Sequence, residues 1–257
     1  MMNKITRSLR SQLYKLVICV SAQIPLKTFQ HLLIEMTTRR AYSLPSDEGL
    51  RFLFRLDAAL YPVKGELAIS YGGGIHTKHR HIGYHDFFVS RIYSEEQVLD
   101  LGCGNGALAY DIAERVGSHV FAIDLNPESI RQACCLYSHP RIEYQVGDIL
   151  RDLPHKHFDV IILSNVLEHL ANRIEFLQDV QAAIQPSHML IRVPLFERDW
   201  QVPLKKELGV EWRLDATHET EYTLECFAAE IAKAGLHITY QKVRWGEIWA
   251  EVVSHAA

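Results

Sequence analysis

The sequence lacks three features that would assign it to a specialised class of protein. None of its five cysteines forms a Cys-x-x-Cys pair, and an odd number with two adjacent members does not suit a disulfide framework. No apolar run reaches the roughly eighteen residues of a membrane-spanning helix. The net charge is only −4, so bulk charge does not indicate nucleic-acid binding. We therefore expect a cytoplasmic protein with no nucleic-acid partner.

A zinc pattern is also absent, although histidines are locally abundant. Residues 71–88 contain three consecutive glycines followed by His76, His79, His81 and His85. No cysteine lies among them, and the spacing matches no standard zinc site. We expect this segment to be a loop that closes over a ligand, and we predict no metal site.

The composition that remains is that of a globular protein. Apolar residues make up 48% of the chain and charged residues 23%. The 257 residues are enough for one full α/β domain and an appendage. We divide the chain into an N-terminal helical extension, 1–70, and a main domain, 71–257.

The N-terminal extension has its own charge balance. Residues 1–40 carry seven Lys and Arg against a single acid. Apolar residues at helical spacing predict helices over 3–21 and around 29–36, followed by a connector at 39–44 and a third helix opening at 45–48. The predicted buried face of the third helix is Leu50, Leu53, Phe54 and Leu60. These helices fit a cap on the main domain, or a basic amphipathic surface in peripheral contact with an anionic membrane.

The main domain alternates predicted strands and helices, which indicates a parallel sheet with right-handed crossovers. The strands are expected at 97–101, 119–123, 142–146, 158–163 and 188–193, with a closing pair at 237–244 and 247–253. The helices between them are expected at 105–116, from Pro127 with Asn126 as cap, at 172–184, and from Thr223 to Gly235. Residues 196–222 form an insertion rich in aromatic and charged residues, whose tryptophans and arginines suit a flat or anionic acceptor or a packed cap.

A glycine turn follows the first strand. Val98–Leu101 is an apolar run that contains one acid, and Gly102, Gly104 and Gly106 come after it. Glycine tolerates positive φ and lets the backbone approach a ligand, whose groups then meet backbone N–H donors and a helix N-terminus. Taken with Ala107, the same turn also satisfies a dinucleotide-binding fingerprint.

Three further landmarks follow this turn in order. They are a second strand ending in an acid, His119–Asp124, a third with its exit, Gln145–Ile149, and a fourth with its exit, Phe158–Leu170. The ordered set resembles the class I S-adenosylmethionine-dependent methyltransferases over about residues 84–254. The resemblance implies an α/β, Rossmann-like class I methyltransferase fold: a mostly parallel seven-stranded sheet with an antiparallel edge hairpin, here with an N-terminal helical extension.

The resemblance also implies a site at the carboxyl ends of the strands. Asp124 would hold the ribose of S-adenosylmethionine, Asp148 the adenine amino group, and Ile149 would pack on the ring. Asp100 would lie near the ammonium of the methionine part. The residues expected at the cofactor are Asp100, Gly102, Cys103, Gly104, Asn105, Gly106, Asp124, Leu125, Asp148, Ile149 and Asn165.

Catalytic residues are harder to find, because the methyl group on a sulfonium is already electrophilic. The protein must align an acceptor and exclude water, and a base is needed only for a poorly ionised hydroxyl or a protonated amine. His169, just past the fourth strand, is the first candidate base. His85 and His218 are weaker candidates.

The function expected is methyl transfer to an O or N atom of a small molecule, such as a glycan, lipid or quinone precursor. One alternative is an NAD(P)-dependent oxidoreductase, which is disfavoured by Asp100 before the glycines and by the exit sequence Asn165–His169. Another is a non-catalytic cofactor-binding protein with the same fold. The sequence does not indicate an oligomeric state.

Overall fold

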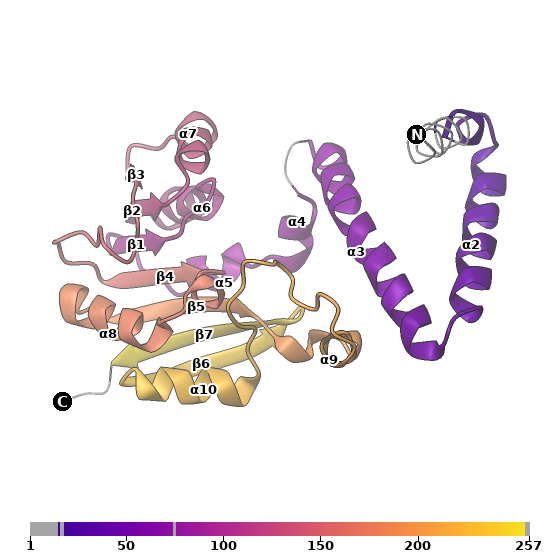
Figure 1. The fold of residues 1–257 in the computed structure, drawn as a ribbon. Coiled ribbons are helices and arrows are strands. Elements are labelled where there is room, and N and C mark those ends of the chain that lie inside the picture. Colours follow the sequence, from indigo (N-terminus) through magenta and orange to yellow (C-terminus); the bar gives the residue numbers. More distant parts are fainter. Residues whose placement is uncertain (1–14, 16–17, 74–75, 255–257) are drawn as a thin grey trace, which may run out of the picture. The chain divides into compact units, whose positions relative to one another are not determined.

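A computed structural model describes residues 15, 18–73 and 76–254. The chain divides into two compact units, Met1–Pro62 and Val63–Ala257. Figure 1 traces both, and each is described here by itself. The domain division at residue 70 stays a prediction.

Helix α2, Leu26–Tyr42, and the first part of α3, Ser46–Tyr71, lie in the first unit. The expected connector at 39–44 is wrong, because α2 continues to Tyr42 and carries two arginines in its last turn, where positive charge favours a helix. The two helices meet closely where a Cβ on Gly49 would lie 2.8 Å from the Ala41 carbonyl oxygen. Most of the predicted helix at 3–21 falls outside the described residues.

The buried face predicted for α3 is reduced to one large side chain. Phe54 is buried, whereas Leu53 and Leu60 are 38% and 51% exposed. Apolar spacing along a helix indicates which residues share a face, but it does not establish that the face is covered. The helix also extends beyond the prediction, through Pro62 to Tyr71.

The second unit is built on a seven-stranded sheet in the order β3-β2-β1-β4-β5-β7-β6. Strands β1 to β5 are parallel, and β7 pairs antiparallel with both β5 and β6. The strands are β1 Gln97–Leu101, β2 His119–Asp124, β3 Ile142–Val146, β4 Val160–Ser164, β5 His188–Pro194, β6 Leu236–Arg244 and β7 Glu247–Ser254. The expected fold class is confirmed, including the antiparallel edge hairpin.

Helices cover both faces of this sheet (Figure 1). They are α5 His85–Val89, α6 Ala107–Val116, α7 Pro127–Leu136, α8 Arg173–Ile184 and α10 Leu224–Lys233. Because side chains alternate along a strand, Leu99 joins the core under α8 and α10, whereas Val98 joins the core under α5 and α6. Two predicted helix caps are confirmed: Asn126 accepts from the Glu128 N–H, and Thr223 accepts from the Cys226 N–H.

Two connecting segments contain short helices that the sequence analysis did not predict. The glycine- and histidine-rich segment holds α4, Lys78–Ile82, ahead of α5. The insertion after β5 holds a 3₁₀ turn, η2, Phe196–Arg198, and helix α9, Gln201–Glu207. Closure of the first segment over a ligand stays a prediction.

Candidate functional site

The glycine turn lies directly after β1, where steric conditions require glycine. Gly102, Gly104 and Gly106 have φ values of 77°, 55° and 80°. A Cβ on Gly102 would lie 2.6 Å from Val166 Cγ2, and one on Gly106 would lie 2.6 Å from Tyr144 Oη. Apart from the two adjoining residues, no atom of the described chain lies within 4 Å of the Cβ position of Gly104. The turn is therefore packed at both ends and open at its centre, where a ligand can approach the backbone.

Asp124 ends β2 and connects that strand to the glycine turn. Its Oδ2 accepts from the Gly104 N–H at 2.8 Å, and its Oδ1 accepts from the Asn126 N–H at 2.9 Å. A carboxylate has about four acceptor positions, so each oxygen can take one further donor. Asn126, not Asp124, caps helix α7. Asp124 is thus available to a pair of ligand hydroxyls, and the neighbouring Leu125 is 70% exposed.

Asp100 lies within β1 and is 1% exposed, and in the part of the chain that the structure describes its Oδ2 has no hydrogen-bond partner. Burial, with the nearby Asp124 charge as a second cause, raises the pKa of Asp100 to about 7. An unpartnered buried carboxyl group is costly unless a ligand satisfies it. A cationic ammonium is the group that this environment favours, which fits the methionine part of the expected cofactor.

Asp148 and Ile149 form the exit of β3. The Leu150 N–H donates to Asp148 Oδ1 at 3.0 Å, while the Asp148 N–H donates to Asp152 Oδ2 at 2.8 Å. Ile149 packs against the core under α8 and α10. This tight turn holds an acid and an apolar side chain at the same edge of the sheet as Asp124.

The exit of β4 holds a buried carboxyl group that the sequence analysis did not assign to the site. Asn165 has φ 60°, and its Nδ2 donates to Glu168 Oε1 at 2.8 Å. Burial raises the pKa of Glu168 to about 7. Glu168 Oε2 and Asn165 Oδ1 are buried and have no partners within residues 15, 18–73 and 76–254. No sequence signal could distinguish this buried glutamate from a surface one next to His169.

The structure brings two of the three candidate catalytic histidines together. The rings of His169 and His218 meet edge to face, with centroids 4.7 Å apart. His169 Nδ1 lies 3.0 Å from Thr217 Oγ1, and burial lowers the pKa of His169. His218 comes from the insertion, whose backbone binds Glu168 through an N–H donated by Glu219 at 2.7 Å.

His85 belongs to a different group of side chains. Its Nδ1 lies 2.8 Å from Asp111 Oδ2 on α6, and its Nε2 is buried without a partner among the described residues. Burial lowers the pKa of His85, so the ring is neutral at pH 7. The carboxylate accepts from the Nδ1–H, which leaves the lone pair on Nε2.

Arg192 on β5 is the second residue whose role the sequence does not reveal. Its guanidinium binds Glu247 through two contacts of 2.8 and 3.1 Å and lies 3.8 Å from the centre of the Tyr84 ring. The Tyr84 hydroxyl in turn lies 3.1 Å from His79 Nδ1, and burial lowers the pKa of His79 to about 4. The positive charge of Arg192 is therefore paired within the fold.

Several aromatic and charged residues of the insertion contact one another within the fold. Trp212 packs edge to face on Phe196 at 5.3 Å, with the Lys206 ammonium 4.9 Å from its ring. Arg198 binds Glu221. Trp212 and Arg198 are therefore parts of a packed cap, whereas Trp200 is 70% exposed.

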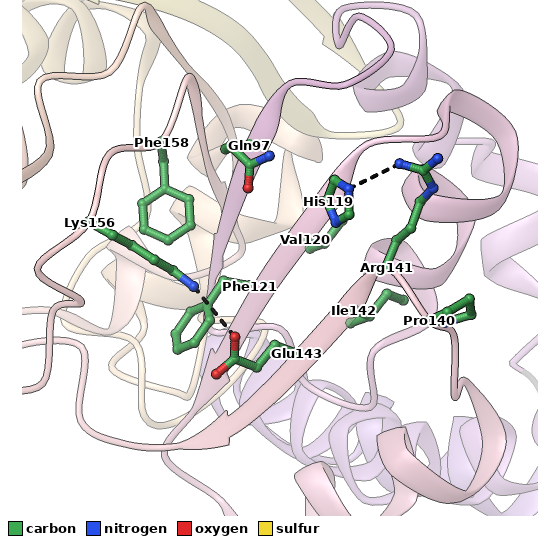
Figure 2. Close-up of a pocket in the computed structure, with 10 residues that line it drawn as sticks. All are labelled: Gln97, His119, Val120, Phe121, Pro140, Arg141, Ile142, Glu143, Lys156 and Phe158. Carbon is green, nitrogen blue, oxygen red and sulfur yellow. Dashed lines mark hydrogen bonds and ion pairs between the residues drawn. The ribbon is translucent and has the colours of Figure 1, made fainter.

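The opposite edge of the sheet has a hollow of about 200 Å3 at the amino ends of β1, β2 and β3 (Figure 2). Its charges are paired: Lys156 lies 3.4 Å from Glu143, and Arg141 lies 3.4 Å from Glu95. None of the predicted site residues lines this hollow. The candidate site is therefore confined to the carboxyl edge.

Known proteins resemble the chain over this same region. Residues 98–187 match the family model described as a methyltransferase domain. A ubiquinone biosynthesis O-methyltransferase from Bradyrhizobium diazoefficiens is 29% identical over 129 residues, which is 48% of this chain and 50% of that protein. The enzyme of the same name from Xylella fastidiosa is 30% identical over 165 residues, 60% of this chain and 66% of that protein.

A solved structure extends the likeness to the fold. A TehB-like SAM-dependent methyltransferase from Corynebacterium glutamicum has a TM-score of 0.53 at 16% identity and covers 77% of this chain and 99% of its own. The chain spans about half the length of the first curated relatives it matches. The domain match, the strand order and the glycine turn agree, and the chain contains a methyltransferase domain with the fold of class I S-adenosylmethionine-dependent methyltransferases.

Proposed function

We propose that this chain transfers the methyl group of S-adenosylmethionine to an oxygen of a small hydroxylated aromatic acceptor of the quinone-precursor type. The observation that carries the proposal is the carboxyl edge itself, where an open glycine turn lies beside Asp124 and a buried, unpartnered Asp100. The relatives named for ubiquinone biosynthesis favour oxygen over nitrogen as the acceptor atom and a quinone precursor over a glycan.

Each part of the cofactor has a matching group in this chain. Asp124 would accept from the two ribose hydroxyls, because both of its oxygens have acceptor capacity left. Asp148 would accept from the adenine amino group, and Ile149 would pack on the ring. The Gly104 backbone and Asp100 would meet the methionine part, where the ammonium would satisfy Asp100 Oδ2.

The cofactor supplies a methyl group bonded to a positively charged sulfur. In the transfer, the acceptor oxygen forms a bond to that methyl carbon while the carbon–sulfur bond breaks, and its electron pair stays on sulfur. The acceptor loses its hydroxyl proton. The chain's own residues must therefore align the oxygen, exclude water and receive the proton.

His85 is the histidine whose geometry best fits a proton acceptor. Asp111 fixes its Nδ1–H, and the Nε2 lone pair has no protein partner. This arrangement of a neutral imidazole oriented by a carboxylate is the usual design of a general base. His169 and His218, which the sequence also suggested, lie together at the β4 exit and have a different role, argued below.

The N-terminal unit is proposed as an accessory element that leaves the cofactor site intact when removed. Among the described residues, no helix has the length and apolar character needed to cross a membrane. Helix α2 exposes Leu26, Leu32 and Met36. These apolar side chains support the proposal that the N-terminal unit makes peripheral contact with a membrane. All five cysteines are unpaired, in keeping with a reducing compartment such as the cytoplasm.

A transfer assay tests the function. The full chain is incubated with methyl-labelled S-adenosylmethionine and either an ortho-dihydroxy aromatic acid, its mono-methyl ether, a simple glycan or a phospholipid. We expect label in the aromatic diol only. Label in the glycan or lipid alone would overturn the acceptor class. Cofactor binding without transfer to any acceptor would favour the non-catalytic alternative.

A further inference from the structure

Three side chains at the β4 exit form a cluster to which the proposed function assigns no part of the cofactor. Glu168, His169 and His218 each offer one ligand atom, and these three atoms lie within 4.8 Å of one another. Three atoms bound to one ion at about 2.1 Å lie roughly 3.0–3.6 Å from one another, so the three side chains would close on the ion through movements of about 1 Å. The cluster thus has the residue types and spacing of a metal site.

The hydrogen bonds of the two rings show which nitrogens are free. Thr217 donates its single hydroxyl hydrogen to Asp215 Oδ1 at 2.7 Å, so it must accept from His169 Nδ1, 3.0 Å away. His218 Nδ1 lies 3.1 Å from Glu221 Oε1, a carboxylate already bound by Arg198, so this nitrogen also donates. Both rings therefore carry their lone pairs on Nε2.

Glu168, the third proposed ligand, also has one atom held by a hydrogen bond and one atom available. Asn165 Nδ2 donates to Glu168 Oε1 at 2.8 Å, which leaves Oε2 buried without a partner. Glu168 is itself 0% exposed. A buried carboxylate oxygen and two imidazole lone pairs are all acceptors, and acceptors alone cannot satisfy one another. A cation is the partner that this group lacks.

The hydrogen bonds that orient the two histidines of the cluster are those expected around a bound metal. Metal-binding histidines usually donate their second ring N–H to a carboxylate or another oxygen, and His218 and His169 do so to Glu221 and Thr217. The insertion is fastened to the β4 exit because Glu219 and Thr220 both donate backbone N–H groups to the Glu168 carbonyl oxygen. This attachment holds His218 beside His169.

We propose that Glu168, His169 and His218 bind one divalent first-row transition-metal ion, such as Zn²⁺, Mn²⁺ or Co²⁺. Two histidines and one carboxylate leave coordination positions open, as catalytic metal sites do. An acceptor oxygen bound there would have a lower pKa and a fixed position, which would ease loss of its proton. This role rests on the proposed function, whereas the metal site itself does not.

This site is not visible in the sequence, because the histidines that lie close together in the chain, at 76–85, match no metal pattern. The ligands here come from the exit of β4 and from the insertion after β5, and only the fold brings them together.

The test titrates Co²⁺ into the full chain, prepared without a histidine tag, and records visible absorption, with Zn²⁺ as competitor. We expect one Co²⁺ per chain with a ligand-field spectrum that Zn²⁺ removes. His169→Ala should weaken binding at least about tenfold, since losing even a partner of a ligand costs roughly 10–100-fold. Glu168→Gln, which keeps the shape and the Asn165 contact, should weaken it similarly.

The matched control is His157→Ala. His157 also lies next to a carboxylate, 3.2 Å from Asp159, but belongs to no group of three metal-ligand side chains among the described residues, and its replacement should leave Co²⁺ binding unchanged. Absence of stoichiometric binding, or equal binding by the parent and His169→Ala, would overturn the site. Calorimetry with S-adenosylmethionine in the presence of a chelator, on the same samples, separates the two proposals. Cofactor binding without metal binding leaves the proposed function standing, and the reverse leaves only the metal site.

Discussion

The two edges of the same sheet differ in how their polar groups are satisfied. At the amino edge, Lys156 is paired with Glu143 (Figure 2). Asp159 accepts from the Gln97 N–H at the same edge. At the carboxyl edge, Asp100 and Glu168 are buried and each keeps an oxygen without a partner. Fold stability alone would favour the first arrangement at both edges. Unsatisfied buried groups therefore mark the edge that meets ligands.

The largest expected effect is on turnover. His85→Ala removes the proposed proton acceptor and should lower the rate by about 10²–10⁴-fold, with little change in cofactor affinity. His119→Ala, which changes a histidine at the amino edge, should have no effect on either. Steady-state rates and calorimetry on both variants measure this contrast. Equal rates for His85→Ala and the parent would remove His85 from the mechanism.

The pH dependence of the rate sharpens the same prediction. Burial lowers the pKa of His85, and the neutral ring is the active form. The parent's rate should therefore fall as pH drops through a value below the usual 6.5. His85→Ala should lose this step. A step that survives in the variant belongs to another group.

The next effect is on cofactor affinity. Hydrogen bonds to a charged acceptor contribute roughly 1.5–3 kcal/mol each, so Asp124→Ala should weaken S-adenosylmethionine binding by about tenfold to several hundredfold. Asp124→Asn should be milder, because it keeps one acceptor oxygen. Glu143→Ala at the amino edge is the control and should leave the affinity unchanged. A thermal melt without ligand checks the fold, and a collapsed melt would make Asp124 a structural residue.

Protonation of Asp100 should couple cofactor binding to pH. Its raised pKa of about 7 means that an ammonium must bind the ionised form. Affinity should weaken by at most about tenfold per pH unit below 7, and binding near pH 6 should release a proton. Calorimetry in buffers of different ionisation enthalpy measures that proton. Heats that do not depend on the buffer would contradict the assignment.

The raised pKa of Asp100 also determines the direction in which the stability of the fold changes with pH. The protonated form of Asp100 is favoured in the folded state, so its contribution is complete below the unfolded pKa near 3.9 and is lost as pH rises through 7. Urea unfolding of the ligand-free chain should show that Asp100→Asn removes a decline in stability between about pH 4 and 7. An unchanged decline would place its origin elsewhere.

The smallest effect is expected at the amino edge. Lys156 and Glu143 are 49% and 67% exposed, and pairs of this kind contribute about 0–1 kcal/mol. Glu143→Gln should therefore change the free energy of unfolding by less than about 1 kcal/mol. A larger loss in urea unfolding would show that this edge depends on its ion pair.

Much of the fold was predictable because its signals are local. Strands β1 and β3 match the predicted bounds, since short apolar runs between turn signals reveal their ends. Asn126 and Thr223 act as caps because a side-chain oxygen near a helix start has few other uses. The glycine turn was visible because positive φ requires a particular residue type.

The rest depends on contacts between distant parts of the chain. Pairing of Arg192 with Glu247 requires β5 and β7 to be neighbours, and the meeting of His169 with His218 requires the insertion to return to the β4 exit. No periodicity encodes either contact. The burial of Glu168 has the same origin, which is why the sequence could suggest His169 as a base but not the cluster around it.

The central claim is that the carboxyl edge of this sheet binds S-adenosylmethionine. Isothermal titration of the full chain with S-adenosylmethionine, its demethylated product and NAD tests it most directly. We predict saturable binding of the first two at one site per chain, and none of NAD. Saturable binding of NAD without binding of S-adenosylmethionine would contradict the claim.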